Sequence, residues 1–160
     1  MTTLTATERR SHLLSAASHG GAYTVKSLVS TIEVPASTTV SSTIGFGRIP
    51  SNARVLGSSR WFCDIVGASS KLDWGLRAVN GNLANADDPD CFSDGTALSS
   101  ALNDSLVITL IANYGLPAWD FVASEASDPG GELEVYATIT DATTTGTAKT
   151  ITLELNYVVD

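Results

Sequence analysis

The sequence has few of the side chains on which enzymes most often depend. Its two histidines, His12 and His19, both lie in the first 21 residues, so the rest of the chain has no imidazole for general-base chemistry, zinc ligation or a Ser-His-Asp arrangement. The sequence also lacks a G-x-x-x-x-G-K-[ST] loop, a G-x-G-x-x-G motif that opens a helix after a strand, and a C-x-x-C pair. Phosphate-binding, dinucleotide-binding and thiol-redox sites are therefore without support. These absences predict a protein that is not an enzyme and uses no cofactor.

Cysteines and long apolar runs are also scarce. Cys63 and Cys91 are too few for a disulfide framework, and we expect both to be reduced, with Cys63 a small buried hydrophobic side chain. A native bridge between them is the alternative. No run approaches the roughly 20 apolar residues of a membrane helix, and the N-terminus has no uninterrupted apolar core of the secretory kind. We therefore expect a soluble protein, made in the cytoplasm, with no membrane partner.

Charged residues make up 16% of the chain, and their signs are unevenly distributed. Residues 1–26 carry Glu8 against Arg9, Arg10 and Lys26, a net charge of +2, which leaves 6 basic and 16 acidic residues, a net charge of −10, in the rest. Such an acidic body repels nucleic acid, because phosphate neutralisation dominates nucleic-acid affinity. The low charge and the abundance of Ser, Thr, Gly and Ala are typical of β proteins that pack against neighbours. We expect protein partners and no nucleic-acid partner.

The first 21 residues, MTTLTATERRSHLLSAASHGG, differ in composition from the rest of the chain. They are rich in Thr, Ser and Ala and end in a glycine pair that would interrupt a helix. We interpret residues 1–21 as a flexible N-terminal arm that becomes ordered on a partner, with Arg9 and Arg10 as its candidate contact residues, and residues 22–160 as one folded domain. The alternative is a loose terminus without a role.

From Tyr23 onward the dominant hydrophobic period is two, the pattern of half-buried strands. In the segment 71–78, four apolar residues alternate with polar residues or glycine, so one face can enter a core: Leu72, Trp74, Leu76 and Ala78. The other candidate strands cover 24–34, 38–46, 54–66, 105–112, 132–139 and 151–159. We expect Trp74 and Leu153 in the core, and a single helical turn that starts at Pro117 and runs through Trp119 and Phe121.

These elements predict an all-β fold. About seven or eight short alternating strands with turn signals between them are typical of an antiparallel β-sandwich or jelly roll, because each sheet must bury its apolar face against a second layer. The stretch DATTTGTAK between the last two strands is rich in turn residues, which predicts that these two strands form a hairpin.

Three groups of residues are candidates for chemical sites. In the stretch ANADDPDCFSDG, Asp87, Asp88, Asp90 and Asp94 could offer oxygen ligands to calcium, although the spacing does not match an EF-hand and a solvated, turn-rich loop is the preferred interpretation. Glu132 and Glu134 lie on the same side of a strand about 7 Å apart, a separation that a glycosidase tolerates but that any polar strand face provides. The three tryptophans could stack on sugars, but core packing is the preferred interpretation of Trp74.

Four stretches resemble small virion proteins encoded near the capsid genes of tailed bacteriophages: GLRAVNGNLANADDPDCF, LIANYGLPAWDFV, SDPGGELEVYATIT and ITLELNYVVD. Those proteins look like decoration, or cement, proteins of the phage head. The resemblance covers roughly residues 22–160, and its motifs are turn and strand signatures with no catalytic content.

The resemblance implies an antiparallel β module in the virion, on the outer face of the capsid. It implies that the module is made in the host cytoplasm, forms a homotrimer at a threefold point, and binds the major capsid protein so that neighbouring subunits are bridged. Two other binding functions stay open, a head-fibre or host-glycan-binding adhesin module and a tail structural component, and an enzyme such as a glycosidase is the least favoured function.

Overall fold

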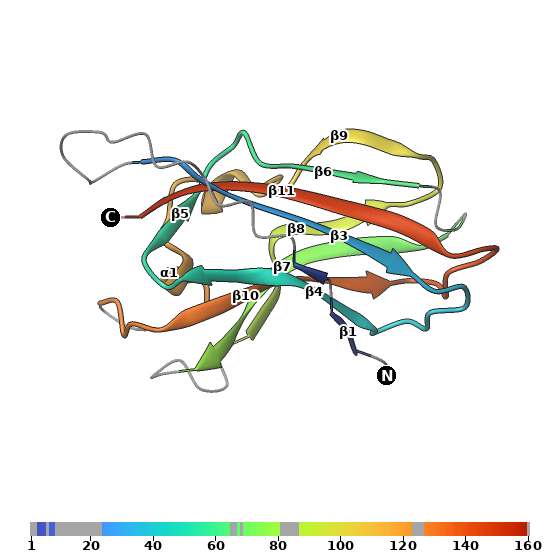
Figure 1. The fold of residues 1–160 in the computed structure, drawn as a ribbon, viewed down its shortest axis with the longest axis horizontal. Helices are drawn as coiled ribbons and strands as arrows, with labels where there is room; N and C mark the ends of the chain where they lie inside the picture. Colours follow the sequence, from blue (N-terminus) through green and yellow to red (C-terminus); the bar gives the residue numbers. More distant parts are fainter. Residues whose placement is uncertain are drawn as a thin grey trace.

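The computed structural model describes residues 3–5, 7–8, 24–64, 67, 69–80, 87–122 and 127–159, which form two packed β-sheets (Figure 1). The strands are β1 (Thr3–Thr5), β2 (Thr7–Glu8), β3 (Lys26–Val34), β4 (Thr43–Pro50), β5 (Ala53–Val55), β6 (Arg60–Cys63), β7 (Lys71–Asn80), β8 (Asp87–Ala97), β9 (Leu102–Leu106), β10 (Glu132–Thr140) and β11 (Lys149–Val159). A 3-10 turn, η2 (Ile111–Asn113), and a short helix, α1 (Ala118–Val122), follow β9. The helical turn expected after Pro117 is therefore confirmed.

The strand order identifies a jelly roll. Sheet A has the order β1-β4-β10-β7-β8, and sheet B has the order β2-β3-β11-β6-β9, with β5 also paired to β11. All of these pairs are antiparallel except β1 with β4. The pairs β7–β8, β6–β9, β4–β10 and β3–β11 are nested, as if one long hairpin had been rolled into two four-stranded layers. The predicted all-β sandwich or jelly roll is confirmed.

The predicted hairpin between the last two strands is wrong. β10 pairs with β4 and β7 in sheet A, whereas β11 pairs with β3, β5 and β6 in sheet B, so the connection 141–148 crosses from one sheet to the other. It lies beside the connection 35–42, which crosses from β3 to β4 at the same end of the molecule (Figure 1). Thr38 N donates to Thr144 Oγ1 at 2.8 Å, and Thr144 N donates to Thr38 O at 3.0 Å. These long-range hydrogen bonds, which no local sequence pattern predicts, hold the two connections together.

The acidic stretch predicted as a turn-rich loop is also different in the structure. Residues 87–97 form β8, the edge strand of sheet A, and pair with β7. The ladder is irregular between Leu72 and Leu76, and at Gly75 an added Cβ would lie 2.1 Å from Asp88 O. The backbone of β8 therefore crosses so close to β7 that glycine is needed there. This irregularity, together with the aspartates, hides the period of two from the sequence.

Three other predicted strands have different limits. The candidate strand 38–46 is shifted to β4, Thr43–Pro50, because residues 35–42 form the connection from β3. The candidate strand 54–66 is interrupted by the turn 56–59 and becomes β5 and β6, because Ser59 N donates to Leu56 O at 2.9 Å. The candidate strand 105–112 is shifted to Leu102–Leu106. After it the chain leaves sheet B, since Thr109 N and Leu110 N both donate to Phe92 O.

One hydrophobic core fills the space between the sheets. Trp74 and Leu153, predicted core residues from β7 and β11, are fully buried. The Trp74 ring lies 4.8 Å from Phe46 of β4 and 5.5 Å from Trp61 of β6, measured between ring centroids. Contacts of this kind add to the burial of large rings. The core assignment of the alternating faces is confirmed.

The cysteines behave as expected from burial. Cys63 and Cys91 are both buried and are not joined in a disulfide, so the alternative of a native bridge is not realised. Burial in the core raises the pKa of the Cys91 thiol well above its ordinary value. Both side chains serve as small hydrophobic core residues.

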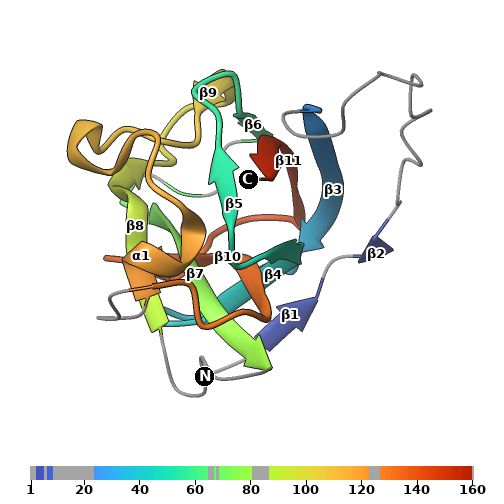
Figure 2. The same ribbon diagram turned by 90° about the vertical axis from the view of Figure 1, so that its left-hand side faces the viewer.

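The described part of the arm lies against the domain of its own chain. β1 pairs in parallel with residues 43–45 of β4, and β2 pairs with residues 30–31 of β3 (Figure 2). The candidate contact residues Arg9 and Arg10, and both histidines, lie outside the described residues. Contact of the arm with another protein stays a prediction. Among the described residues, no helix is long and apolar enough to span a membrane.

Truncation of Trp74 tests the core assignment. Trp74→Ala is expected to lower the free energy of unfolding by about 3–5 kcal/mol, because it removes a fully buried ring that contacts both sheets. Denaturation in guanidinium measures the loss. Tyr114→Ala, at a ring that is 61% exposed, is the control and is expected to cost about 1 kcal/mol or less. A Trp74→Ala protein with the wild-type midpoint would contradict the assignment.

Candidate interaction surface

Exposed hydrophobic side chains gather in one segment of the described structure. Of the six large hydrophobic side chains that are exposed there, four lie within the eleven residues from β9 to the start of α1: Leu106, Leu110, Tyr114 and Leu116. We call these four residues the 106–116 surface. Isolated exposed apolar residues need no explanation, but four of them in one short segment make that segment the candidate binding surface.

The backbone of this segment is anchored to the neighbouring strand. Val107 and Ile108 turn into the core, and Thr109 N and Leu110 N donate to Phe92 O at 2.9 and 3.3 Å. The side chain of Asn113, in η2, donates to Cys91 O at 2.6 Å. Hydrogen bonds to β8 and the burial of Val107 and Ile108 thus fix the segment, so its exposed side chains project from a defined framework.

The ring of Tyr114 packs against a glycine. A Cβ at Gly57 would lie 2.6 Å from Tyr114 Cε2, so the ring rests directly against the Gly57 backbone. The next residue, Gly115, has a φ of 82° and accepts a hydrogen bond from Arg54 Nη1 at 2.6 Å. A left-handed φ of this kind favours glycine. The turn therefore presents the Tyr114 ring at the surface while its backbone is held.

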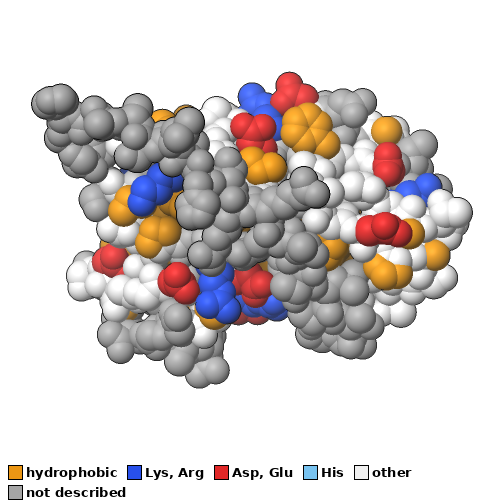
Figure 3. All heavy atoms as spheres, in the orientation of Figure 1, with side chains coloured by type: hydrophobic (Ala, Val, Ile, Leu, Met, Phe, Trp, Pro, Cys, Tyr) orange, Lys and Arg blue, Asp and Glu red, His pale blue; other side chains and the backbone are white. Residues whose placement is uncertain are grey.

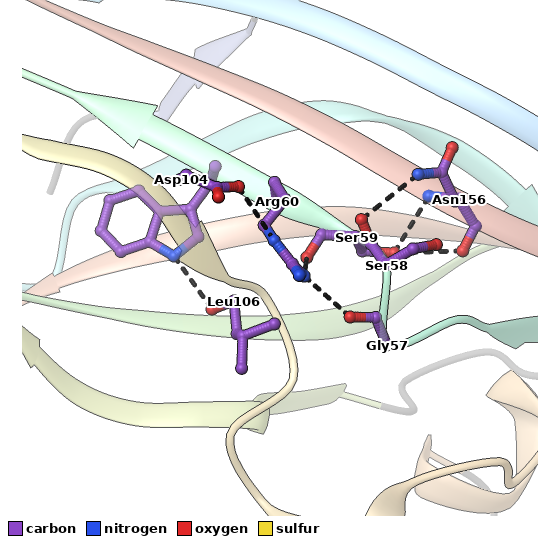
Figure 4. Close-up of polar contacts among 8 residues, drawn as sticks. Gly57, Ser58, Ser59, Arg60, Asp104, Leu106 and Asn156 are labelled. Carbon is purple, nitrogen blue, oxygen red and sulfur yellow. Dashed lines mark hydrogen bonds and ion pairs between the residues drawn. The ribbon is translucent and has the colours of Figure 1, made fainter.

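Arg60 connects the turn between β5 and β6, which contains Gly57, to β9 (Figure 4). Its Nη1 donates to Gly57 O at 2.7 Å and to Ser59 O at 3.1 Å, and its Nε pairs with Asp104 Oδ1 at 2.9 Å. Asp104 has a φ of 67°, which aspartate tolerates better than most residues. One guanidinium thus joins the β5–β6 turn to the strand that precedes the 106–116 surface.

The same turn is fixed to the centre of sheet B. Ser59 Oγ donates to Asn156 O at 3.1 Å and accepts from Asn156 N at 3.0 Å, as Figure 4 shows. The indole of Trp61 donates to Leu106 O at 3.1 Å, which ties the first residue of the 106–116 surface to the core. Hydrogen bonds from side chains thus hold the backbone of this segment, and its apolar side chains face outward.

The four aspartates considered as calcium ligands are distributed along β8. Asp87 accepts a hydrogen bond from the Tyr136 hydroxyl, and burial, followed by a hydrogen bond with Asp90, raises the pKa of Asp88. Within the described ranges, no three His, Cys, Asp or Glu side chains come together as a group that could hold a metal ion. The described residues therefore contain no group of side chains of the kind that the calcium-binding alternative requires.

The two glutamates considered as a glycosidase pair have separate basic neighbours. Glu132 lies 3.4 Å from Arg48, at the surface, and Glu134 lies 2.6 Å from Arg77 Nε. The guanidinium of Arg77 also lies 4.9 Å from the centre of the Tyr136 ring. Both carboxylates therefore take part in contacts across the outer face of sheet A, where a structural role accounts for them.

Charge on the visible surface is mixed. On the face drawn in Figure 3, the described acidic and basic side chains lie in small neighbouring groups, without a broad patch of one sign. Close opposite charges of this kind are screened by salt and give little long-range attraction. Exposed apolar side chains are therefore the stronger signal for binding.

Sequence reasoning did not find the 106–116 surface. The period of two predicts a strand at 105–112, which includes Leu106 and Leu110 but not Tyr114 or Leu116, whereas in the structure only Leu106 of these four belongs to a strand. A usable signal was present: apolar residues continue beyond position 108 without a period of two, in a stretch that contains Asn, Gly and Pro.

The fold is similar to that of proteins in phage capsids. No protein-family model matches the chain, and no curated protein matches it. In solved structures, a chain of the capsid of Ralstonia phage GP4 matches with a TM-score of 0.66 and 18% identity, over 89% of this chain and 89% of that chain. A chain of the cyanophage Pam1 capsid asymmetric unit matches with a TM-score of 0.55 and 15% identity, over 92% of this chain and 93% of that chain. At these identities the likeness establishes a shared fold.

The buried Tyr136 predicts a loss of stability at alkaline pH. Its ring is 2% exposed, and burial, together with the hydrogen bond to Asp87, raises the pKa of its hydroxyl well above the value of about 10 in an unfolded chain. Above pH 10 the unfolded chain loses this proton and the folded chain keeps it, so this group lowers the free energy of unfolding by up to about 1.4 kcal/mol per pH unit. Below pH 10 it has no such effect.

Comparison with a variant isolates the effect. The free energy of unfolding of the wild type is expected to fall more steeply between about pH 10 and pH 11.5 than that of Tyr136→Phe. Tyr114→Phe, at an exposed ring, controls for the loss of one phenol. Equal slopes for wild type and Tyr136→Phe would show that the buried hydroxyl is not the cause.

Proposed function

We propose that this chain is a non-enzymatic decoration, or cement, protein of a tailed-phage head, which binds the outer surface of the capsid and bridges major-capsid subunits. The observation that carries the proposal is the match of 89% of this chain with 89% of a chain of the GP4 capsid. Because the shares are equal, the two chains are about equally long, and the single jelly roll accounts for nearly all of both.

The charge of the body supports an external position. Residues 27–160 carry 6 basic and 16 acidic side chains, a net charge of −10. Packaged DNA repels such a surface, since affinity for nucleic acid depends mainly on neutralising phosphates. The outer face of the capsid is the side on which this charge is tolerated.

The 106–116 surface is the proposed contact with the major capsid protein. Its side chains are apolar and exposed, and hydrogen bonds from Arg54 and Arg60 fix the backbone below them. A preorganised surface loses less conformational freedom on binding than a loose one. Arg9 and Arg10, which come directly after β2 in the sequence, are a second proposed contact, directed at an acidic patch of a neighbouring subunit.

Stabilisation of the shell follows from mass action. A protein that binds the mature lattice and not its separated subunits favours the lattice by about 2.7 kcal/mol per site when its free concentration is a hundred times Kd. We further propose a homotrimer, because a threefold point on a shell is best matched by a threefold ligand and three linked contacts raise avidity.

The position of the protein in the virion tests the function. A density map of the intact particle is expected to contain this jelly roll on the outside of the head, at threefold or quasi-threefold points, in contact with at least two major-capsid subunits. Density for the module in rings of the tail would make it a tail component. Density confined to projecting fibres, together with binding to a glycan array, would make it an adhesin.

Substitution in the 106–116 surface tests the contact. Leu110→Ser with Tyr114→Ser is expected to raise the Kd for undecorated heads by at least about tenfold, because burial of a large apolar side chain contributes about 1.5–3 kcal/mol. Quantitative binding to purified heads measures the change. Val40→Ser is the matched control, since Val40 is 41% exposed and Leu110 is 37% exposed, but Val40 lies in the β3–β4 connection. Wild-type affinity for the double variant would assign the contact to another surface.

A further inference from the structure

The N-terminal strands cover one edge of each sheet. β1 pairs with β4 at the edge of sheet A, β2 pairs with β3 at the edge of sheet B, and Ala6 alone separates the two strands in the sequence. Figure 2 shows both strands along the side of the sandwich where β3 and β4 lie. An open edge offers unpaired backbone groups to any strand that reaches it. The two strands therefore extend each sheet by one short strand at this edge.

This attachment is small compared with the pairing inside the domain. β1 contributes three residue pairs, Thr3↔Thr43 to Thr5↔Gly45, and β2 contributes two, whereas β11 and β3 share nine. Few bonds must break for residues 3–8 to leave. The same bonds form again if the strands pair with the edges of another copy.

The chain between β2 and β3 is longer than its own closure requires. Glu8 pairs with Ser30, and Lys26 begins β3 four residues earlier, about 13 Å away along the strand. Residues 9–25, seventeen in all, connect Glu8 to Lys26. Seventeen residues can span up to about 55–60 Å when extended, which is enough to cross to an adjoining subunit.

Charge also favours a neighbour of the same kind. Arg9 and Arg10 follow directly after β2, and the body of every copy carries a net charge of −10 beyond residue 26. Residues 1–26 of each copy have a net charge of +2 and the rest of the chain has a net charge of −10, and opposite net charges on two copies favour encounter.

We propose that residues 3–8 are exchanged between copies, so that β1 and β2 of one subunit pair with β4 and β3 of its neighbour around a closed ring. This inference rests on the self-association in the proposed function and does not depend on binding to the capsid. The partner is a second copy of this chain because it presents the same edges in the same register. Strand exchange of this kind links subunits without any new interface chemistry.

Cysteines placed in register report which copy donates the strand. Thr7 faces Thr31 in the antiparallel β2–β3 pair, a position at which Cα atoms lie about 4.5–5.5 Å apart, within reach of a disulfide. Full-length Thr7→Cys and Thr31→Cys proteins are mixed in guanidinium, refolded together and oxidised. A covalent heterodimer, identified by intact mass, forms where β2 of one copy lies on β3 of another.

A second mixture controls for accidental cross-linking. Thr31 also faces Thr152 of β11 within the domain, with their hydroxyl oxygens 2.9 Å apart, so Thr31→Cys mixed with Thr152→Cys should give little heterodimer. Cys63 and Cys91 are buried and common to all samples. The Thr7/Thr31 mixture is expected to give about tenfold more heterodimer than the Thr31/Thr152 mixture.

Light scattering on the same samples separates the possible failures. A trimer with equal heterodimer in both mixtures overturns the exchange and leaves self-association standing. A monomer at every concentration, without heterodimer, overturns the exchange and the trimer together. Neither result bears on whether the protein sits on the head, which the density map decides.

Discussion

The ring contact between Trp61 of β6 and Trp74 of β7, with centroids 5.5 Å apart, joins the two sheets at the middle of the core. Each sheet has one apolar face, and neither face can be left in water. Because these two faces pack against each other, the apolar side chains of both sheets are buried between them. The outer faces can therefore carry polar side chains such as Arg77 and Glu134. The position of every connection, including the one that presents Tyr114, follows from how the strands are shared between the two layers.

The sequence predicts the features that depend on neighbours along the chain. The period of two in 71–78 and 132–139 identified β7 and β10, and Pro117 identified α1, because alternation and a fixed φ are local properties. Prediction from the sequence fails where the position of a segment depends on a residue far away along the chain. The connection 141–148 has hairpin composition, yet Thr144 bonds to Thr38 and the chain crosses to the other sheet. β8 was missed because its aspartates resemble a loop until β7 is placed beside it. Of the candidate contact residues, Arg9 and Arg10 are recognised from the sequence by their charge, whereas the 106–116 surface requires knowledge of which apolar residues face outward.

The 106–116 surface illustrates how a rigid scaffold can present a segment that we propose binds the capsid. The four side chains of this surface are exposed. Arg54 donates to Gly115 O in the segment, and Asn113 of the segment donates to Cys91 O of β8. Arg60 donates to Gly57 O, in the turn against which the Tyr114 ring packs. Such an arrangement separates the residues that determine shape from the residues that touch a partner. Substitution of the exposed group can therefore alter binding with little effect on the fold, as is common for functional loops on β scaffolds.

The place of β11 in sheet B has a consequence for how the chain matures. β11 is the last described strand in the sequence, but it lies in the interior of sheet B between β3 and β6, and Thr152 bonds to Thr31 across 121 positions of sequence. Contacts between distant positions slow folding, because a long loop must close before they form. β11 alone joins β3 to the rest of sheet B, so β3 becomes part of the sheet only when β11 has paired with it. The edge to which β2 attaches is therefore completed late in folding, whichever copy supplies that strand.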